Sequence, residues 1–293
     1  MNKHPLVSIV TPSYNQSQFI EETIRSVLLQ QDYSNLEYII IDGGSTDGSV
    51  DIIRKYADRL DYWVSEKDNG SAHAINKGFA RAHGEVFAWL NSDDFLLPGA
   101  ISRIVEMHNE HPTAVAWVGS CYRIDPMGRI LSVVIPHGLD RNSLADWGYS
   151  GFFYQPSCFF AKQAWYGIGS LDENLLFAFD LDFWLRLSSI GSFAYTTDII
   201  SAAIIHKDAK TQAQRLEMHA ETIAVQIKHG YHEAGIKRLA RLLDKPSWNC
   251  RIKSTLRAAF RDMGHSIKIR SGNEEPQHIQ FPSVWLQGNC PQR

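Results

Sequence analysis

The chain has 293 residues, of which 44% are hydrophobic and 21% charged, with 29 Lys and Arg residues against 32 Asp and Glu residues. This composition excludes a disordered, collagen-like or coiled-coil protein and predicts one large or two modest globular domains. No apolar run approaches the roughly 18 residues of a membrane span. The segment from Met1 to Pro5 also lacks the apolar stretch of a signal peptide, so we expect a cytoplasmic protein.

The four cysteines, Cys121, Cys158, Cys250 and Cys290, lie far apart in the sequence. No pair has the spacing of a zinc finger or a redox motif. We therefore expect free thiols.

Apolar runs and helical spacing alternate in the first third of the chain. The expected strands are Leu6–Val10, Leu36–Ile41, Tyr62–Val64 and Val86–Leu90. Segments with apolar residues at helical spacing separate these strands, among them Ser71–His83. Strands that alternate with helices predict a parallel sheet covered by helices.

The pattern becomes less regular after Pro98. It predicts a helix through Ile101–His108, a hairpin of Ala114–Ile124 with Ile130–Ile135, a helix over Leu181–Ser189 and a strand pair near Phe193–Ile205. We expect a first half at residues 1–98 and a second half at 99–210, fused on one mixed sheet. Residues 211–293 are expected to form a helical, basic C-terminal extension.

Each expected strand of the first half ends in polar residues. These ends are Thr11–Asn15, Asp42–Asp47, Glu66–Gly70 and Asn91–Asp94. In open α/β sheets ligands bind outside the carboxyl ends of the strands. Asp93 and Asp94 are adjacent carboxylates after an apolar strand, and their repulsion favours a bound divalent cation, itself holding a diphosphate. The alternative for Asp94 is a cap on the following turn.

Four motifs in order carry a family resemblance: Val7–Asn15, Asp42–Gly48, Asn91–Asp94 and Phe179–Arg186. Together they resemble the inverting family 2 glycosyltransferases of the GT-A fold over roughly residues 5 to 210. The segment from Ser65 through Gly78 resembles the subgroup that builds bacterial surface polysaccharides. The resemblance implies an α/β GT-A fold, a Rossmann-like nucleotide-binding half joined to an acceptor half.

The resemblance also implies a nucleotide-diphosphate sugar donor, usually a UDP-sugar, and a glycan or lipid-linked acceptor. The implied nucleotide-binding residues are Pro12, Tyr14, Asp42, Asp68, Asn91 and Ser92. Tyr14 offers an aromatic face for a base, and Asp42 can accept a hydrogen bond from base or ribose. Gly43 stands where family members often have a second carboxylate, which leaves the base specificity open.

The family's metal motif is usually Asp-x-Asp, and here it reads Asn91-Ser92-Asp93. The resemblance therefore assigns Mn²⁺ or Mg²⁺ mainly to Asp93, with Asp94 close by. His206 matches a position where related enzymes often hold a histidine near the metal or diphosphate. A structural histidine is the alternative.

Asp180 is the expected general base, which would deprotonate the acceptor hydroxyl during an inverting displacement. Phe179 replaces the glutamate that usually precedes it in the family. Asp180 could instead be a helix N-cap. Asp182 is two positions further on and does not share its helical face, so we expect at most one of the two to point at the acceptor.

The region Lys237–Arg270 contains ten basic and two acidic residues, a local net charge of +8. Leu239, Leu242 and Leu243 lie among these basic residues, a pattern typical of peripheral contact with an anionic membrane. The alternative is an amphipathic helix packed on the catalytic domain with a solvated basic face. No motif for nucleic-acid binding is present.

Two other functions stay open from the residues alone. Paired carboxylates also serve metal-dependent phosphohydrolases and nucleotidyltransferases, although no Walker motif is present. Asn91 and Phe179, which replace acidic residues of the family, would also suit a catalytically silent nucleotide-sugar-binding protein.

Overall fold

The structure is a computed structural model that describes residues 4–30, 32–206, 214–243, 268–269 and 277–278. The contacts divide the chain into two compact units, Met1–Ala209 and Lys210–Arg293. Within the described ranges, every helix is too short or too polar to cross a membrane.

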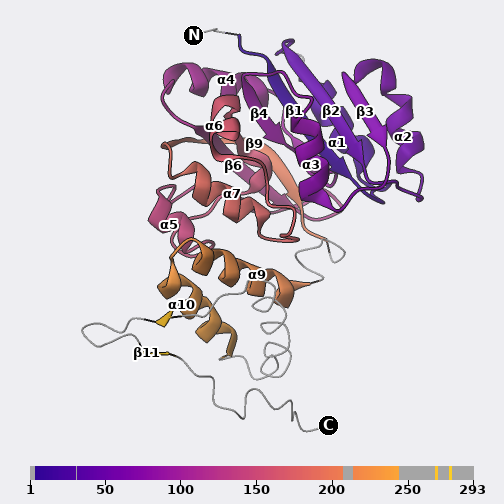
Figure 1. Ribbon diagram of the computed structural model, residues 1–293. Helices are drawn as coiled ribbons and strands as arrows, with labels where there is room; N and C mark the ends of the chain where they lie inside the picture. Colours follow the sequence, from indigo (N-terminus) through magenta and orange to yellow (C-terminus); the bar gives the residue numbers. More distant parts are fainter. Residues whose placement is uncertain (1–3, 31, 207–213, 244–267, 270–276, 279–293) are drawn as a thin grey trace, which may run out of the picture. The chain divides into compact units, whose positions relative to one another are not determined.

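The first unit alternates strands and helices along its first half (Figure 1). Its strands are β1 (Val7–Ser13), β2 (Leu36–Asp42), β3 (Tyr62–Ser65), β4 (Val86–Trp89), β5 (Asp94–Leu96), β6 (Ala116–Ile124), β7 (Ile130–Val134), β8 (Cys158–Ala161) and β9 (Phe193–Ile204). Its helices are α1 (Ile20–Leu28), α2 (Ser49–Lys55), α3 (Ser71–Phe79), α4 (Ala100–Glu110), α5 (Arg141–Ala145), α6 (Lys162–Ile168) and α7 (Phe179–Leu187), with short 3₁₀ turns at Ala57–Arg59 and Gln155–Ser157.

In the described part of the chain these strands form one mixed sheet in the order β3-β2-β1-β4-β8-β6-β9-β5, with β7 paired to β6. The strands β3, β2, β1 and β4 are parallel, whereas β8 runs antiparallel to both β4 and β6. The parallel half and the irregular half therefore share one sheet, as the sequence predicted.

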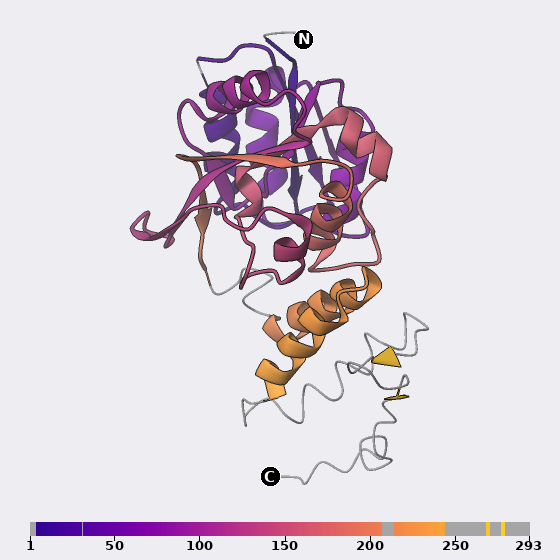
Figure 2. The same cartoon turned by 90° about the vertical axis from the view of Figure 1, so that its left-hand side faces the viewer.

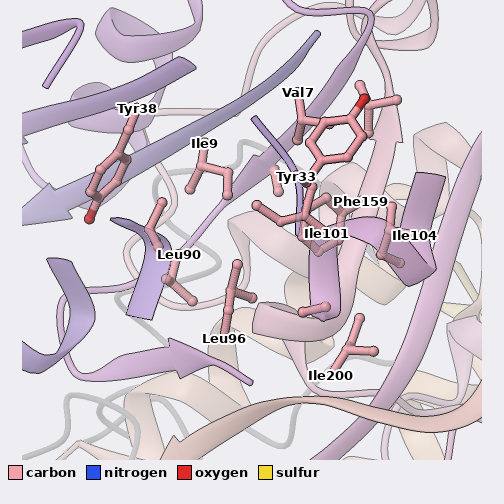
Figure 3. Close-up of a cluster of buried hydrophobic side chains, with 14 of the residues drawn as sticks. Val7, Ile9, Tyr33, Tyr38, Leu90, Leu96, Ile101, Ile104, Phe159 and Ile200 are labelled. Atoms are coloured by element: carbon pink, nitrogen blue, oxygen red, sulfur yellow. The ribbon is translucent and has the colours of Figure 1, made fainter. Parts of the chain in front are cut away.

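Burial on both faces explains why apolar residues occupy consecutive positions, as in Ile9–Val10 of β1 and Tyr38–Ile41 of β2. On one face, Val7 and Ile9 pack with side chains of α1, α2 and α4 in the main core, where Ile101 and Ile104 come from α4 (Figure 3). On the other face, α3 lies so close to β1 that a Cβ on Gly78 would be 2.3 Å from Val10 Cγ1.

An aromatic cluster joins that second face to α6 and α7. Trp89 at the end of β4 stacks on Trp184 of α7, with ring centroids 5.0 Å apart and planes 5° from parallel. Phe160 and Trp165 continue the cluster. This packing fixes α7 against the strand that precedes Asn91.

Two predicted elements differ in the structure. We predicted that the first strand ends at Val10, but β1 continues to Ser13 alongside β2. Pairing with β4 stops at Val10, so β1 has no partner strand on that side at Pro12. The missing N–H of Pro12 therefore costs no hydrogen bond to β4.

The predicted strand pair near Phe193–Ile205 is wrong, because β9 is one strand. The irregularity within this segment consists of register shifts against β6 and does not divide the strand. Asp198 in this segment forms an ion pair with Arg103, with 2.7 Å between Oδ2 and Nε.

The cysteines Cys121 and Cys158 are free and buried, as predicted. Burial raises the pKa of the Cys121 thiol to about 12, so it is not a nucleophile at neutral pH. The other two cysteines lie outside the described residues.

The second unit contains α9 (Arg215–Lys228) and α10 (His232–Leu243), which lie side by side (Figure 2), and a short pairing of β10 (Lys268–Ile269) with β11 (Gln277–His278). Leu239 and Leu242 of α10 pack against Ile223 of α9. Most of the basic region, from Asp244 to Ile267, lies outside the described residues.

Arg238 belongs to the basic region for which the sequence predicts membrane contact, but the structure buries it. The residue is only 5% exposed, and its Nη1 lies 3.4 Å from Nδ1 of His219 in α9. Leu239, Leu242 and Arg238 of α10 are therefore packed within the helix pair, whereas Ile236 is exposed.

Candidate active site

The predicted polar residues gather where parallel strands end. Ser13 of β1 lies beside Asp42 of β2, which lies beside Ser65 of β3. The next strand on the other side of β1, β4, leads directly into the turn of Asn91–Asp94. One edge of the sheet thus holds all four predicted polar ends.

Backbone and side-chain hydrogen bonds join the loops after β1 and β2. The amide of Asn15 donates to Ser45 Oγ at 2.8 Å, and the Thr46 amide donates to Asn15 Oδ1 at 2.9 Å. Pro12 is buried in β1 beneath these loops. Tyr14 is left 62% exposed, so its ring is available as a stacking surface.

Asp42 is fully buried and shapes its own turn. Its Oδ2 accepts hydrogen bonds from the amides of Gly44 (3.1 Å) and Ser45 (2.9 Å) and from Ser65 Oγ (2.7 Å). Its Oδ1 accepts from Ser45 Oγ at 2.6 Å. This geometry engages the carboxylate in the turn rather than offering it to a base or ribose, the contact that we expected from the sequence.

Gly43 contacts Asp68 across the site. A Cβ built on Gly43 would lie 2.8 Å from Asp68 Oδ2 and 3.1 Å from its Cγ. The other oxygen, Oδ1, accepts a hydrogen bond from the Gly70 amide at 2.8 Å. The carboxylate of Asp68 therefore occupies the space in which a side chain at position 43 would begin.

The turn Asn91–Asp94 is held from two sides. Thr23 of α1 donates its hydroxyl to the carbonyls of Ser92 and Asp94, at 3.0 and 2.8 Å. The Asn91 amide nitrogen lies 3.2 Å from Asp94 Oδ2 and 3.1 Å from Gln155 Oε1. Neither Thr23 nor Gln155 was predicted, since one lies inside a helical pattern and the other in an aromatic stretch.

Asp93 and His206 meet at this turn although 113 positions separate them. Asp93 Oδ2 lies 3.1 Å from His206 Nε2, and the Phe19 ring packs against the imidazole with centroids 4.8 Å apart. His206 Nδ1 is buried without a hydrogen-bond partner among the described residues. The structure thus brings together two of the three predicted metal ligands.

This pair suits a divalent cation. A carboxylate oxygen and an imidazole nitrogen are ordinary ligands of Mn²⁺, and neighbouring ligands of an octahedral ion at about 2.1 Å lie about 3 Å apart. Among the described residues, no three His, Cys, Asp or Glu side chains form a complete metal cluster. A cation held by Asp93 and His206 would take its other ligands from phosphate oxygens and water.

Asp94 lies deeper than Asp93 and is 7% exposed. Burial raises its pKa well above the usual value, and the charge of Asp93 raises it further. Its side chain is engaged with Asn91, so Asp93 is the more accessible of the two carboxylates.

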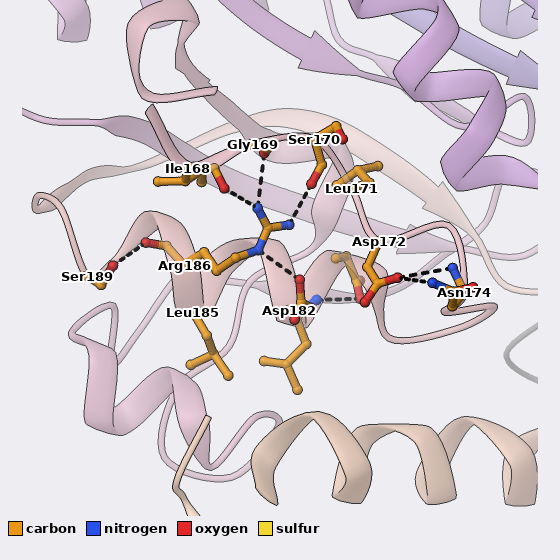
Figure 4. Close-up of polar contacts among 12 residues, drawn as sticks. Ile168, Gly169, Ser170, Leu171, Asp172, Asn174, Asp182, Leu185, Arg186 and Ser189 are labelled. Atoms are coloured by element: carbon orange, nitrogen blue, oxygen red, sulfur yellow. Dashed lines mark hydrogen bonds and ion pairs between the residues drawn. The ribbon is translucent and has the colours of Figure 1, made fainter. Parts of the chain in front are cut away.

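The two acidic residues of α7 have different surroundings. Asp182 is 1% exposed, and its Oδ2 pairs with Arg186 Nε at 2.8 Å. Arg186 also donates to the carbonyls of Ile168, Gly169 and Ser170, at 2.8 to 3.0 Å (Figure 4). Asp180 is partly exposed and is not the N-cap, a position that Ala178 occupies. Asp182 therefore stabilises the fold, and Asp180 is the residue of the two that can face a substrate.

Sequence comparison gives one family match and many relatives. The family model described as Glycosyl transferase family 2 matches residues 8–167, more than half of the chain. An uncharacterized glycosyltransferase of Rickettsia typhi is 30% identical over 71% of this chain and 66% of its own length. The chondroitin synthase of Escherichia coli is 27% identical over 81% of this chain and only 34% of its own length.

Solved structures resemble the fold. Residues 1–349 of S. aureus TarS in complex with UDP-GlcNAc superpose with a TM-score of 0.65 at 15% identity, covering 87% of this chain and 80% of that one. The mannosyltransferase PcManGT of Pyrobaculum calidifontis, in complex with GDP-Man and Mn²⁺, gives a TM-score of 0.61 at 20% identity, covering 90% and 76%. These likenesses confirm the predicted GT-A fold.

Proposed function

Because this chain belongs to glycosyltransferase family 2, we propose that it transfers a sugar from a nucleotide-diphosphate sugar to a hydroxyl of a glycan or lipid-linked acceptor, with inversion. The observation that carries this proposal is the Asp93–His206 pair at the end of β4, on the sheet edge where the loops after β1, β2 and β3 also gather. The similarity to a chondroitin synthase supports a role in building a polysaccharide.

In this proposal the loops after β1 and β2 bind the nucleoside. The exposed ring of Tyr14 stacks on the base, and Pro12 supports the loop from below. Asp42 keeps the turn after β2 in shape through its four hydrogen bonds. Asn91 and Ser92 place the donor over the end of β4.

Asp93 and His206 would hold Mn²⁺ or Mg²⁺, with Asp94 behind them. When bound, such an ion neutralises the charge that develops on the departing diphosphate. The Asn91 amide and the Thr23 hydroxyl keep the turn in place, so that Asp93 Oδ2 remains directed at His206. Binding of the diphosphate would then depend on both side chains.

Asp180 is the proposed general base. It would accept the proton of the acceptor hydroxyl as the oxygen attacks the anomeric carbon from the face opposite the diphosphate, which inverts the configuration. The stack of Trp184 on Trp89 holds α7 against the strand that leads into the Asn91 turn. Its neighbour Asp182 is unsuited to this role because it is buried in the ion pair with Arg186.

The competing functions find less support. A metal-dependent phosphohydrolase or nucleotidyltransferase has no family match to support it, whereas the glycosyltransferase has one over residues 8–167. A silent binding protein would keep the nucleotide site without needing an accessible carboxylate such as Asp180.

A donor panel tests the proposed function. The full chain is incubated with UDP-, GDP-, CDP- and dTDP-sugars in MnCl₂, and release of nucleoside diphosphate is followed without an acceptor. Slow release from one class of donor is the expected result. Hydrolysis of phosphate monoesters would favour the phosphohydrolase, and binding without turnover in the presence of candidate acceptors would favour the silent protein.

We also propose that the protein is cytoplasmic and contacts the inner face of an anionic membrane peripherally. On α10, Lys237 and Arg241 are exposed, and each basic residue near such a surface contributes about 1 kcal/mol. Sedimentation with anionic vesicles, lost in high salt and in the Lys237→Glu/Arg241→Glu variant, would support the contact. If the protein did not sediment with anionic vesicles at low salt, α10 would have only a structural role.

A further inference from the structure

Among the described carboxylates near the nucleotide loops, Asp68 combines a partly exposed position with an unengaged oxygen. Its Oδ1 accepts the Gly70 amide at 2.8 Å, whereas Oδ2 accepts no hydrogen bond from the described residues and lies against Gly43. Asp42, by contrast, is fully buried and accepts four hydrogen bonds from neighbouring groups. A ligand that approaches this loop would therefore meet Asp68 rather than Asp42.

The position of Asp68 follows from the sheet. Asp42 and Ser65 are register partners at the ends of β2 and β3, and Ser65 Oγ donates to Asp42 Oδ2 at 2.7 Å. The loop after β3 therefore runs beside the turn after β2. Asp68 lies in this loop, three residues after Ser65. Gly43 has an ordinary negative φ, so what a side chain at position 43 would disturb is the Asp68 carboxylate and not the backbone.

From this contact, and resting on the proposed function above, we infer that the carboxylate of Asp68 recognises the base of the nucleotide. Gly43 has no side chain and therefore leaves room for this carboxylate. The carboxylate missing after Asp42 is thus supplied from the neighbouring loop. The two positions form a complementary pair, since a side chain at position 43 and the carboxylate of Asp68 cannot occupy the same space.

The Asp68 carboxylate can only accept hydrogen bonds, and this property discriminates between pyrimidine bases. Uracil presents a single N–H donor at N3, which one carboxylate oxygen satisfies. Cytosine has an acceptor at N3, which the negative charge would repel. The site therefore favours uridine diphosphate donors over cytidine diphosphate donors.

Titration calorimetry of the full chain with UDP, CDP and GDP in MnCl₂ tests this inference. Loss of a hydrogen bond to a charged group should weaken UDP binding about 10- to 100-fold in Asp68→Ala. In Asp68→Asn, which has the same shape, the amide can donate to N3 of cytosine, so the preference for UDP over CDP should collapse. Glu66→Gln in the same loop is the control, since Glu66 pairs with Lys77 instead, and should leave the preference unchanged.

Moving the carboxylate from position 68 to position 43 distinguishes a role in base recognition from a role in holding the loop. Gly43→Asp alone should weaken UDP binding because the new side chain meets Asp68, whereas Gly43→Asp/Asp68→Gly should restore both the affinity and the UDP preference. An unchanged UDP-to-CDP ratio in Asp68→Asn would overturn the inference while leaving the proposed function intact. If the wild-type chain bound none of the nucleotides, the proposed function itself would fail.

Discussion

Replacing Asp182 by Asn should destabilise the first unit although it does not touch the reacting atoms. The carboxylate is 1% exposed and lies 2.8 Å from Arg186 Nε. At an effective dielectric constant of about 20, two unit charges at this distance attract by about 6 kcal/mol before desolvation is counted. Removing one partner of a buried pair costs about 3–5 kcal/mol.

We expect the lower end of that range. The Arg186 side chain is 22% exposed and keeps three carbonyl acceptors (Figure 4), so Asp182→Asn should lower the free energy of unfolding by about 3 kcal/mol. Urea unfolding followed by tryptophan fluorescence measures this, because Trp184 lies in the same helix. With an m-value of about 3 kcal/mol/M the midpoint falls by about 1 M. Asp180→Asn is the matched control, and equal midpoints for Asp182→Asn and wild type would refute the reasoning.

Three further changes probe catalysis, the metal pair and pH. Asp180→Asn should retain donor binding while transfer falls about 10²- to 10⁴-fold, and near-normal transfer would place the base elsewhere. His206→Ala should raise the manganese concentration for half-maximal donor hydrolysis about tenfold or more; an unchanged manganese requirement would give His206 a structural role. Burial acts to raise the pKa of Glu37, but hydrogen bonds from Ser8 and His83 outweigh it and the pKa is lowered, so its stabilising contribution is complete above about pH 4.5 and is lost as pH falls through the folded-state pKa. The stability difference between wild type and Glu37→Gln should therefore shrink in acid, and a difference constant from pH 7 to pH 3 would contradict this.

The parallel half of the fold was predictable because its signals are local. Buried strands such as β2 contain a short apolar run, here Tyr38–Ile41, and each ends in a polar turn that the sequence displays directly. The prediction of two strands failed at β9, which is one strand. Asp198 within this strand pairs with Arg103, 95 positions away, and no local sequence pattern contains such a tertiary contact.

The site could be predicted in its residues but not in its contacts. Strand ends indicated Asp93, and the family resemblance indicated His206, yet their 3.1 Å separation depends on β9 lying beside β5. Arg238 shows the opposite limit, since charge patterning assigned it to a surface and the packing of α9 against α10 buries it. The spacing in the sequence shows which residues share a face of a helix. Tertiary packing decides which of these faces is buried.

The most direct test of the account is the metal dependence of nucleotide binding. UDP is titrated into the full chain in MnCl₂ and again in excess EDTA, with Asp93→Ala measured under both conditions and its folding checked by circular dichroism. The account predicts binding by the wild type in manganese, which is lost in EDTA and in folded Asp93→Ala. Equal UDP affinity with and without the metal, or wild-type affinity in Asp93→Ala, would contradict it.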